Sequence, residues 1–101
     1  MRDSGYDVVV DKEVWELIPT FIENRKKELS ALRAALTGAD IAQLRLLGHR
    51  IKGVGASYGF PRVSALGKEI EDCVRADQLT SLTHILDVYG DYLSRVRVSC
   101  A

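Results

Sequence analysis

From residue 11 onward, the apolar residues of this 101-residue chain recur at intervals of three and four almost without a break. This spacing places apolar side chains on one face of an α-helix and does not match the two-residue period of a half-buried strand. Only two prolines, Pro19 and Pro61, interrupt the pattern. The periodicity predicts a helical fold, and the length suffices for one domain with a single modest core.

Capping residues, glycines and prolines divide this periodic region into one short and four long segments. The segments begin at Asp11, after Pro19, at Asp40, at Pro61 and at Asp77. The last one keeps its apolar spacing as far as Val96. Because connections of a few residues cannot carry the chain back along a long helix, consecutive long helices must run antiparallel. We therefore expect an all-α fold, an antiparallel up-down four-helix bundle with a short extra N-terminal helix, in a single domain over residues 11–101.

The first ten residues do not share this pattern. The run YDVVV at 6–10 is the only β-like stretch, and a single strand has nothing to pair with. We therefore expect residues 1–10 to form an extended N-terminal arm.

Charge and hydropathy restrict the partners. Fourteen basic residues balance fourteen acidic ones, so no net positive field exists to hold nucleic acid or an anionic membrane. The longest apolar runs fall far short of the ~20 residues needed to span a bilayer, and the N-terminus lacks the apolar segment of a secretory signal. We expect a cytoplasmic monomer that binds neither nucleic acid nor membrane.

One of only two histidines, His49, lies in the glycine-rich stretch GHRIKGVGASYGF at 48–60. At roughly 100° per residue, Leu47, Ile51, Val54 and Tyr58 fall on the opposite side of the predicted helix. That side carries the core, so His49 is predicted to face water. Its own face carries the following residues: Ala42, Arg45, Leu46, Lys52, Gly53, Ala56 and Phe60.

The surroundings of His49 favour a chemical role over that of a casual surface histidine. Gly53 and Ala56 leave the neighbouring surface almost free of side chains, at a cost of ~1 kcal/mol for a glycine inside a helix. Such a surface lets another protein approach closely. Lys52, three residues on, can place an ammonium near an anion carried by the imidazole. An exposed nucleophile, a cation and a cleared surface together suit covalent phosphoryl carriage.

This stretch resembles the H-x-[IL]-K-G-x5-G signature of histidine-containing phosphotransfer (HPt) domains, which belong to bacterial phosphorelays. The matching residues are His49, Ile51, Lys52, Gly53 and Gly59. The resemblance extends over most of the chain, from about residue 14 to residue 93. It implies that His49 is the phosphorylated residue and that Lys52 is the cation near the phosphoryl group. Glu71 falls where the family places a glutamate or glutamine that contacts the histidine or its phosphoryl group.

Glu71 is predicted to lie on the flank of its helix, about 100° from the inward-facing Ile70. If that flank borders the helix of His49, the carboxylate can accept a hydrogen bond from Nδ1–H and leave Nε2 free to attack. The alternative is an ordinary exposed glutamate. The remaining predicted site residues form a receiver-docking surface, apolar at its centre and charged at its rim. They are Arg45, Leu46, Gly53, Ala56, Phe60 and Lys68.

The resemblance implies that His49 accepts a phosphoryl group from a receiver-domain aspartate, or from a partner kinase, and passes it to another response regulator receiver. The partners are receiver domains and a sensor or hybrid histidine kinase. No cofactor of its own is expected, because Mg²⁺ would come from the acidic pocket of the receiver. The isolated chain would be a phosphocarrier without autokinase activity, since it has no Walker-type loop.

Two alternatives remain from the sequence. The chain could be a phosphotransfer domain detached from a larger kinase, or a non-catalytic helical adaptor that binds a signalling partner through the His49 face. A metal or haem bundle is disfavoured because the only other histidine, His84, is predicted to lie on the outer side of the last helix.

Overall fold

The computed structural model describes residues 6–101, and most of these residues are helical. In chain order the elements are β1 (Asp7–Val10), α1 (Lys12–Trp15), α2 (Ile18–Thr37), α3 (Ile41–Tyr58), α4 (Pro61–Arg75), α5 (Leu79–Arg95) and β2 (Arg97–Cys100). The predicted predominance of helix is confirmed, and two short strands are added to it. None of the helices in this part of the chain combines the length and apolar character that crossing a bilayer requires.

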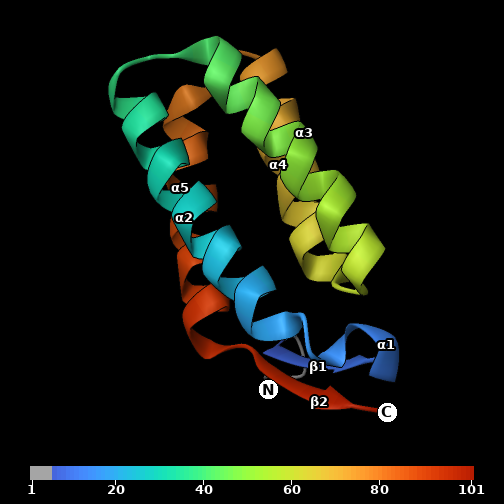
Figure 1. The fold of residues 1–101 in the computed structure, drawn as a ribbon. Helices are drawn as coiled ribbons and strands as arrows, with labels where there is room; N and C mark the ends of the chain where they lie inside the picture. Colours follow the sequence, from blue (N-terminus) through green and yellow to red (C-terminus); the bar gives the residue numbers. More distant parts are fainter. Residues whose placement is uncertain (1–5) are drawn as a thin grey trace.

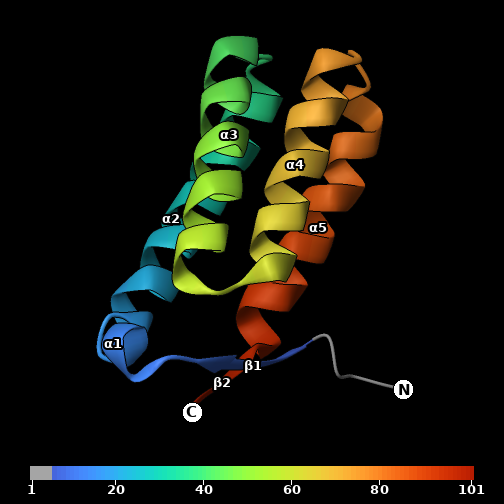
Figure 2. The same cartoon turned by 90° about the vertical axis from the view of Figure 1, so that its right-hand side faces the viewer.

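The four long helices α2 to α5 lie side by side (Figures 1 and 2). The helix pair α3 and α4 makes the most extensive contact, while α5 packs against both α2 and α4. Each helix turns its apolar stripe inward, as the three-four spacing predicts. Fully buried side chains come from all four helices and include Leu32, Leu44, Ile51, Ile70, Leu82 and Leu86.

The ends of α3 follow from local chemistry. The Asp40 carboxylate accepts a hydrogen bond from the Gln43 backbone N–H at 3.1 Å, which satisfies one of the free donors of the first turn. At the other end, Gly59 adopts a left-handed φ of 83°, which glycine tolerates without steric penalty. Pro61 then occupies the first turn of α4, where its missing N–H costs no hydrogen bond.

The expectation of an unpaired N-terminal arm is wrong for residues 7–10. Strand β1 pairs in parallel with β2, with Val8 opposite Val98. The Arg97 guanidinium also binds the Asp7 carboxylate at 2.9 Å. The last helix ends at Arg95, so Val96, predicted as helical, is already extended. Residues 1–5 of the predicted arm lie outside the described residues.

The α3–α4 contact depends on small residues. A Cβ atom at Gly55 of α3 would lie 2.5 Å from the backbone nitrogen of Ser64 in α4. A backbone atom cannot rotate away, so a larger residue would force the helices apart. Gly55 is therefore a packing residue of the α3–α4 contact.

We expect Gly55→Ala to lower the free energy of unfolding by about 1–3 kcal/mol, because the added methyl group overpacks this contact. Gly53→Ala is the matched control on the same helix. A Cβ at Gly53 meets nothing within 4 Å, so the higher helix propensity of alanine should stabilise the protein by about 0.5–1 kcal/mol. Thermal unfolding followed by circular dichroism measures both effects. Equal midpoints for the two variants would contradict the assigned role of Gly55.

Candidate phosphotransfer site

The His49 side chain lies in the middle of α3 and is 69% exposed. Its neighbours Leu47 and Ile51 are buried on the opposite side of the helix. The predicted outward direction of His49 is therefore confirmed. The other histidine, His84, is exposed on α5, the one long helix that has no extensive contact with α3.

The Glu71 side chain, from α4, connects the two polar groups of the site. Its Oε2 atom lies 3.0 Å from His49 Nδ1, and its Oε1 atom accepts a hydrogen bond from Lys52 Nζ at 2.8 Å. The residue is only 9% exposed, so it is not an ordinary surface glutamate. The flank of α4 that carries Glu71 thus does border α3, as the predicted contact requires. One carboxylate bridges the imidazole and the ammonium.

The hydrogen bond from Lys52 is the main cause that lowers the pKa of Glu71, and the bond to His49 lowers it further. Burial acts in the opposite direction because it disfavours the charged form. The carboxylate is therefore ionised at neutral pH and can only accept hydrogen bonds. His49 Nδ1 must then carry the proton, which leaves the Nε2 lone pair available.

The lowered pKa gives the bridge a defined pH dependence. The ionised bridge contributes stability that is fully present above the ordinary pKa of a glutamate. This contribution is lost as the pH falls through the lowered pKa of Glu71. Acid therefore releases the imidazole and the ammonium together.

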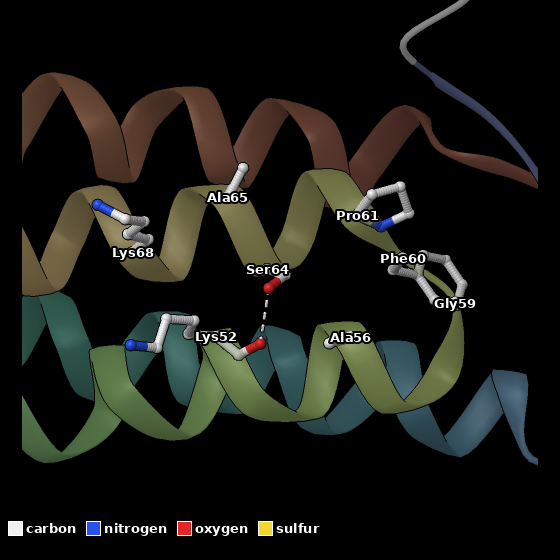
Figure 3. Close-up of a pocket in the computed structure, with 8 residues that line it drawn as sticks. All are labelled: Lys52, Ala56, Gly59, Phe60, Pro61, Ser64, Ala65 and Lys68. Carbon is white, nitrogen blue, oxygen red and sulfur yellow. Dashed lines mark hydrogen bonds between the residues drawn. The ribbon is translucent and has the colours of Figure 1, made fainter.

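An open groove of about 410 Å³ runs between α3 and α4 beside Lys52 (Figure 3). Lys52 and Lys68 stand at one end, and Pro61 lies toward the other. Its walls between them are small and mainly apolar, with Ala56 on α3 and Ala65 on α4. The groove thus combines an apolar floor with cationic groups at the end nearest the imidazole.

A second hollow, of about 400 Å³, lies on the other side of the imidazole and is lined by Ala42, Arg45, Leu46, His49 and Glu71. Leu46 is one of the few large apolar side chains that are more than half exposed, at 51%. Lys68 forms an exposed ion pair with Asp72 at 2.9 Å. Arg45 forms no ion pair within residues 6–101. His49 is therefore flanked on both sides by low, partly apolar surface with cations at its edge.

Most of the predicted docking residues are exposed on this surface, but Phe60, which borders the groove at the end away from Lys52, is not. Gly53 and Ala56 are exposed beside the site. Phe60 is fully buried and stacks on Phe21 with ring centroids 4.7 Å apart. The prediction failed because the helical wheel was continued through residue 60, whereas Gly59 turns the chain and directs Phe60 into the core.

Sequence reasoning also missed residues that hold the site together. The Ser64 hydroxyl donates a hydrogen bond to the Lys52 carbonyl at 2.8 Å (Figure 3), and Gly67 packs directly on the backbone of Lys52. The only available signal was the spacing of Ser64, Gly67 and Glu71 at successive intervals of three and four residues, which places them on one face of a helix. No group of three or more side chains suited to holding a metal ion occurs in the described part of the chain.

The chain belongs to the Hpt domain family, whose model matches residues 16–99. The match contains His49, Lys52 and Glu71 and all four long helices, whereas β1 precedes it. The resemblance inferred from the signature is thereby confirmed, and with it a role in histidine phosphotransfer within phosphorelays. No curated protein and no solved structure matches the chain.

Proposed function

We propose that His49 accepts a phosphoryl group from a receiver-domain aspartate, or from a partner kinase, and passes it to the receiver of another response regulator. One observation carries this proposal. The exposed imidazole is held at Nδ1 by a carboxylate that also binds the ammonium of Lys52. This contact orients the ring and leaves the nucleophilic nitrogen free.

The transfer follows from the tautomer. Nε2 attacks the phosphorus of the acyl phosphate in line with the leaving aspartate oxygen, so an N–P bond forms while the P–O bond breaks. The aspartate leaves as a carboxylate. The imidazole becomes a cation that still carries its Nδ1 proton, and the Glu71 carboxylate at 3.0 Å offsets that charge. Passing the group to a second receiver reverses these steps.

Lys52 supplies the cation for the phosphorylated state. In the free protein its ammonium is bound to Glu71, and both groups lie beside the ring that would carry the phosphoryl group. A phosphoryl group adds negative charge next to the ammonium only after transfer. In this proposal Mg²⁺ and most of the charge stabilisation come from the acidic pocket of the receiver.

The partner surface follows from the same geometry. We assign receiver docking to the apolar strip formed by Leu46, Gly53 and Ala56, with Arg45, Lys52 and Lys68 facing the acidic partner.

The proposal takes the side-by-side arrangement of α2 to α5 as an antiparallel up-down four-helix bundle, with α1 as an extra helix. It describes a cytoplasmic, monomeric phosphocarrier without autokinase activity.

The direct test is to incubate the protein with receiver domains from its own genome after labelling each with radioactive phosphate. Loss of label from a receiver together with gain of label on this chain supports the proposal. Stable binding of a receiver without transfer from any of them would instead support the adaptor alternative.

We expect Lys52→Ala to slow transfer to His49 by about tenfold, because a charge-assisted contact to the phosphoryl group contributes roughly 1–2 kcal/mol at a partly exposed site. The fold should remain intact, since the Lys52 side chain is 37% exposed. Single-turnover labelling from a phosphorylated receiver, in both directions, provides the measurement. Lys26→Ala, on an exposed position of α2, is the control for loss of one positive charge. Unchanged rates in both directions would show that Lys52 is only a surface charge.

A further inference from the structure

Gly67 marks the place where α4 comes closest to the backbone of α3. A Cβ atom at Gly67 would lie 2.8 Å from the Cα atom of Lys52, still closer to the Lys52 nitrogen, and 3.0 Å from the carbonyl oxygen of Gly48. All three are backbone atoms inside a helix, and none of them can rotate away. Only a residue without a side chain fits here while the two helices keep their present separation.

This contact lies at the level of the phosphotransfer site. Gly48 precedes His49 directly, and Lys52 follows it by three residues. The Ser64 hydroxyl, one turn before Gly67, fixes α4 to the Lys52 carbonyl at 2.8 Å. Glu71 follows Gly67 by four residues and therefore lies on the same face of α4. The helix that supplies the carboxylate thus rests on the turn that supplies the imidazole and the ammonium.

We propose that Gly67 is a positioning residue for the phosphotransfer site, because its missing side chain sets the α3–α4 separation at which the Glu71 carboxylate reaches both His49 Nδ1 and Lys52 Nζ. The inference rests on the proposed function and deepens it by naming what holds Glu71 in place. If Gly67 had only a structural role, its substitution would lower the stability of the protein and leave the contacts of Glu71 unchanged.

A small increase in the α3–α4 separation is enough to break the two hydrogen bonds of Glu71. Ordinary contact begins at 3.4 Å, so an alanine at position 67 must move at least 0.6 Å away from the Lys52 Cα atom, which a Cβ would now meet at 2.8 Å. The two bonds of Glu71, at 3.0 and 2.8 Å, would then approach or exceed the length at which a hydrogen bond is lost. The buried position of Glu71 restricts compensating rotation of its side chain. Without its acceptor, Nδ1 loses its preference for the proton, and Nε2 becomes protonated in a larger fraction of molecules.

The test is the tautomer of His49 in the unphosphorylated full chain, measured by NMR with ¹⁵N-labelled histidine at about pH 8.5, where histidine side chains are neutral. Glu71→Ala provides the reference ratio of a ring without its carboxylate. We expect Gly67→Ala to lower the ratio of the Nδ1–H to the Nε2–H tautomer about tenfold, toward that reference. The exposed His84 ring is an internal control and should not change. Leu86→Ala, which removes buried packing on α5 without adding atoms between α3 and α4, controls for lost stability.

A double variant tests whether Gly67 acts through Glu71. The ratio in Gly67→Ala/Glu71→Ala should equal that in Glu71→Ala alone. A further change would mean that Gly67 acts on the ring by another route, and this would overturn the proposal. A folded Gly67→Ala protein with the wild-type ratio would overturn it as well.

Gly48→Ala keeps the proposal testable if Gly67→Ala does not fold. A Cβ at Gly48 would lie 3.2 Å from the backbone nitrogen of Glu71 and 2.9 Å from the Cγ2 methyl of the buried Ile70, which is a milder clash at the same contact because no backbone atom comes closer than 3.2 Å. The same shift of tautomer is expected, and a wild-type ratio in folded Gly48→Ala would count against the proposal.

Because the tautomer is measured without phosphate, its outcome is independent of labelling. Failure of His49 to accept phosphate would overturn the proposed function and leave the tautomer result standing.

Discussion

His49→Gln is expected to take up no detectable label from a phosphorylated receiver. Glutamine keeps a polar side chain of similar length but has no nucleophilic nitrogen, because its amide lone pair is delocalised. The side chain is 69% exposed, so the substitution should leave the fold unchanged. The measurement is transfer of radioactive phosphate followed by acid treatment, since a phosphohistidine loses its label in acid.

His84→Gln is the matched control and should retain full labelling, because His84 is exposed on α5. Labelling of folded His49→Gln at the wild-type level, or transfer of the label to His84, would refute the proposed mechanism.

Gly53→Glu is expected to slow transfer by at least about 100-fold, since a like charge placed against an acidic receiver pocket costs roughly 3 kcal/mol or more. The position suits this test because a side chain there meets nothing within 4 Å in the free protein. The variant should be as stable as the wild type or more so, because glycine is a poor helix former. Transfer rates and thermal unfolding are to be measured on the same preparation.

Two controls separate the causes of the loss. Gly53→Gln adds nearly the same bulk without charge and should slow transfer much less if charge repulsion dominates. His84→Glu adds a negative charge on an exposed part of α5 and should leave transfer unchanged. Normal transfer by folded Gly53→Glu would show that the surface around Gly53 does not meet the receiver.

Helix boundaries at Asp40, Gly59 and Pro61 were predictable, because capping and chain reversal depend on residues within one turn. The outward direction of His49 was predictable for the same reason, since the helical period alone fixes which residues share a face.

The contact between Glu71 and His49 was predictable only on the condition that the flank of α4 carrying Glu71 borders α3. The helical wheel placed Glu71 on a flank of α4, and only the packing of α4 on α3 could show that this flank faces His49. Phe60 was assigned to the wrong environment because a single φ at Gly59 reverses the direction of the chain. The pairing of β1 with β2 joins residues about 90 positions apart, and no local pattern reports such a contact.

The sequence by itself therefore determined the helical segments, the exposed nucleophile, the nearby lysine and the bare surface at Gly53, since each depends on geometry within one helix. The tertiary structure alone decided which carboxylate holds the imidazole, which aromatic ring enters the core and which glycine brings the two helices together. These features depend on the separation and rotation of α3 against α4. That geometry is set by backbone contacts at Gly48, Gly55 and Gly67 between segments that are distant along the chain.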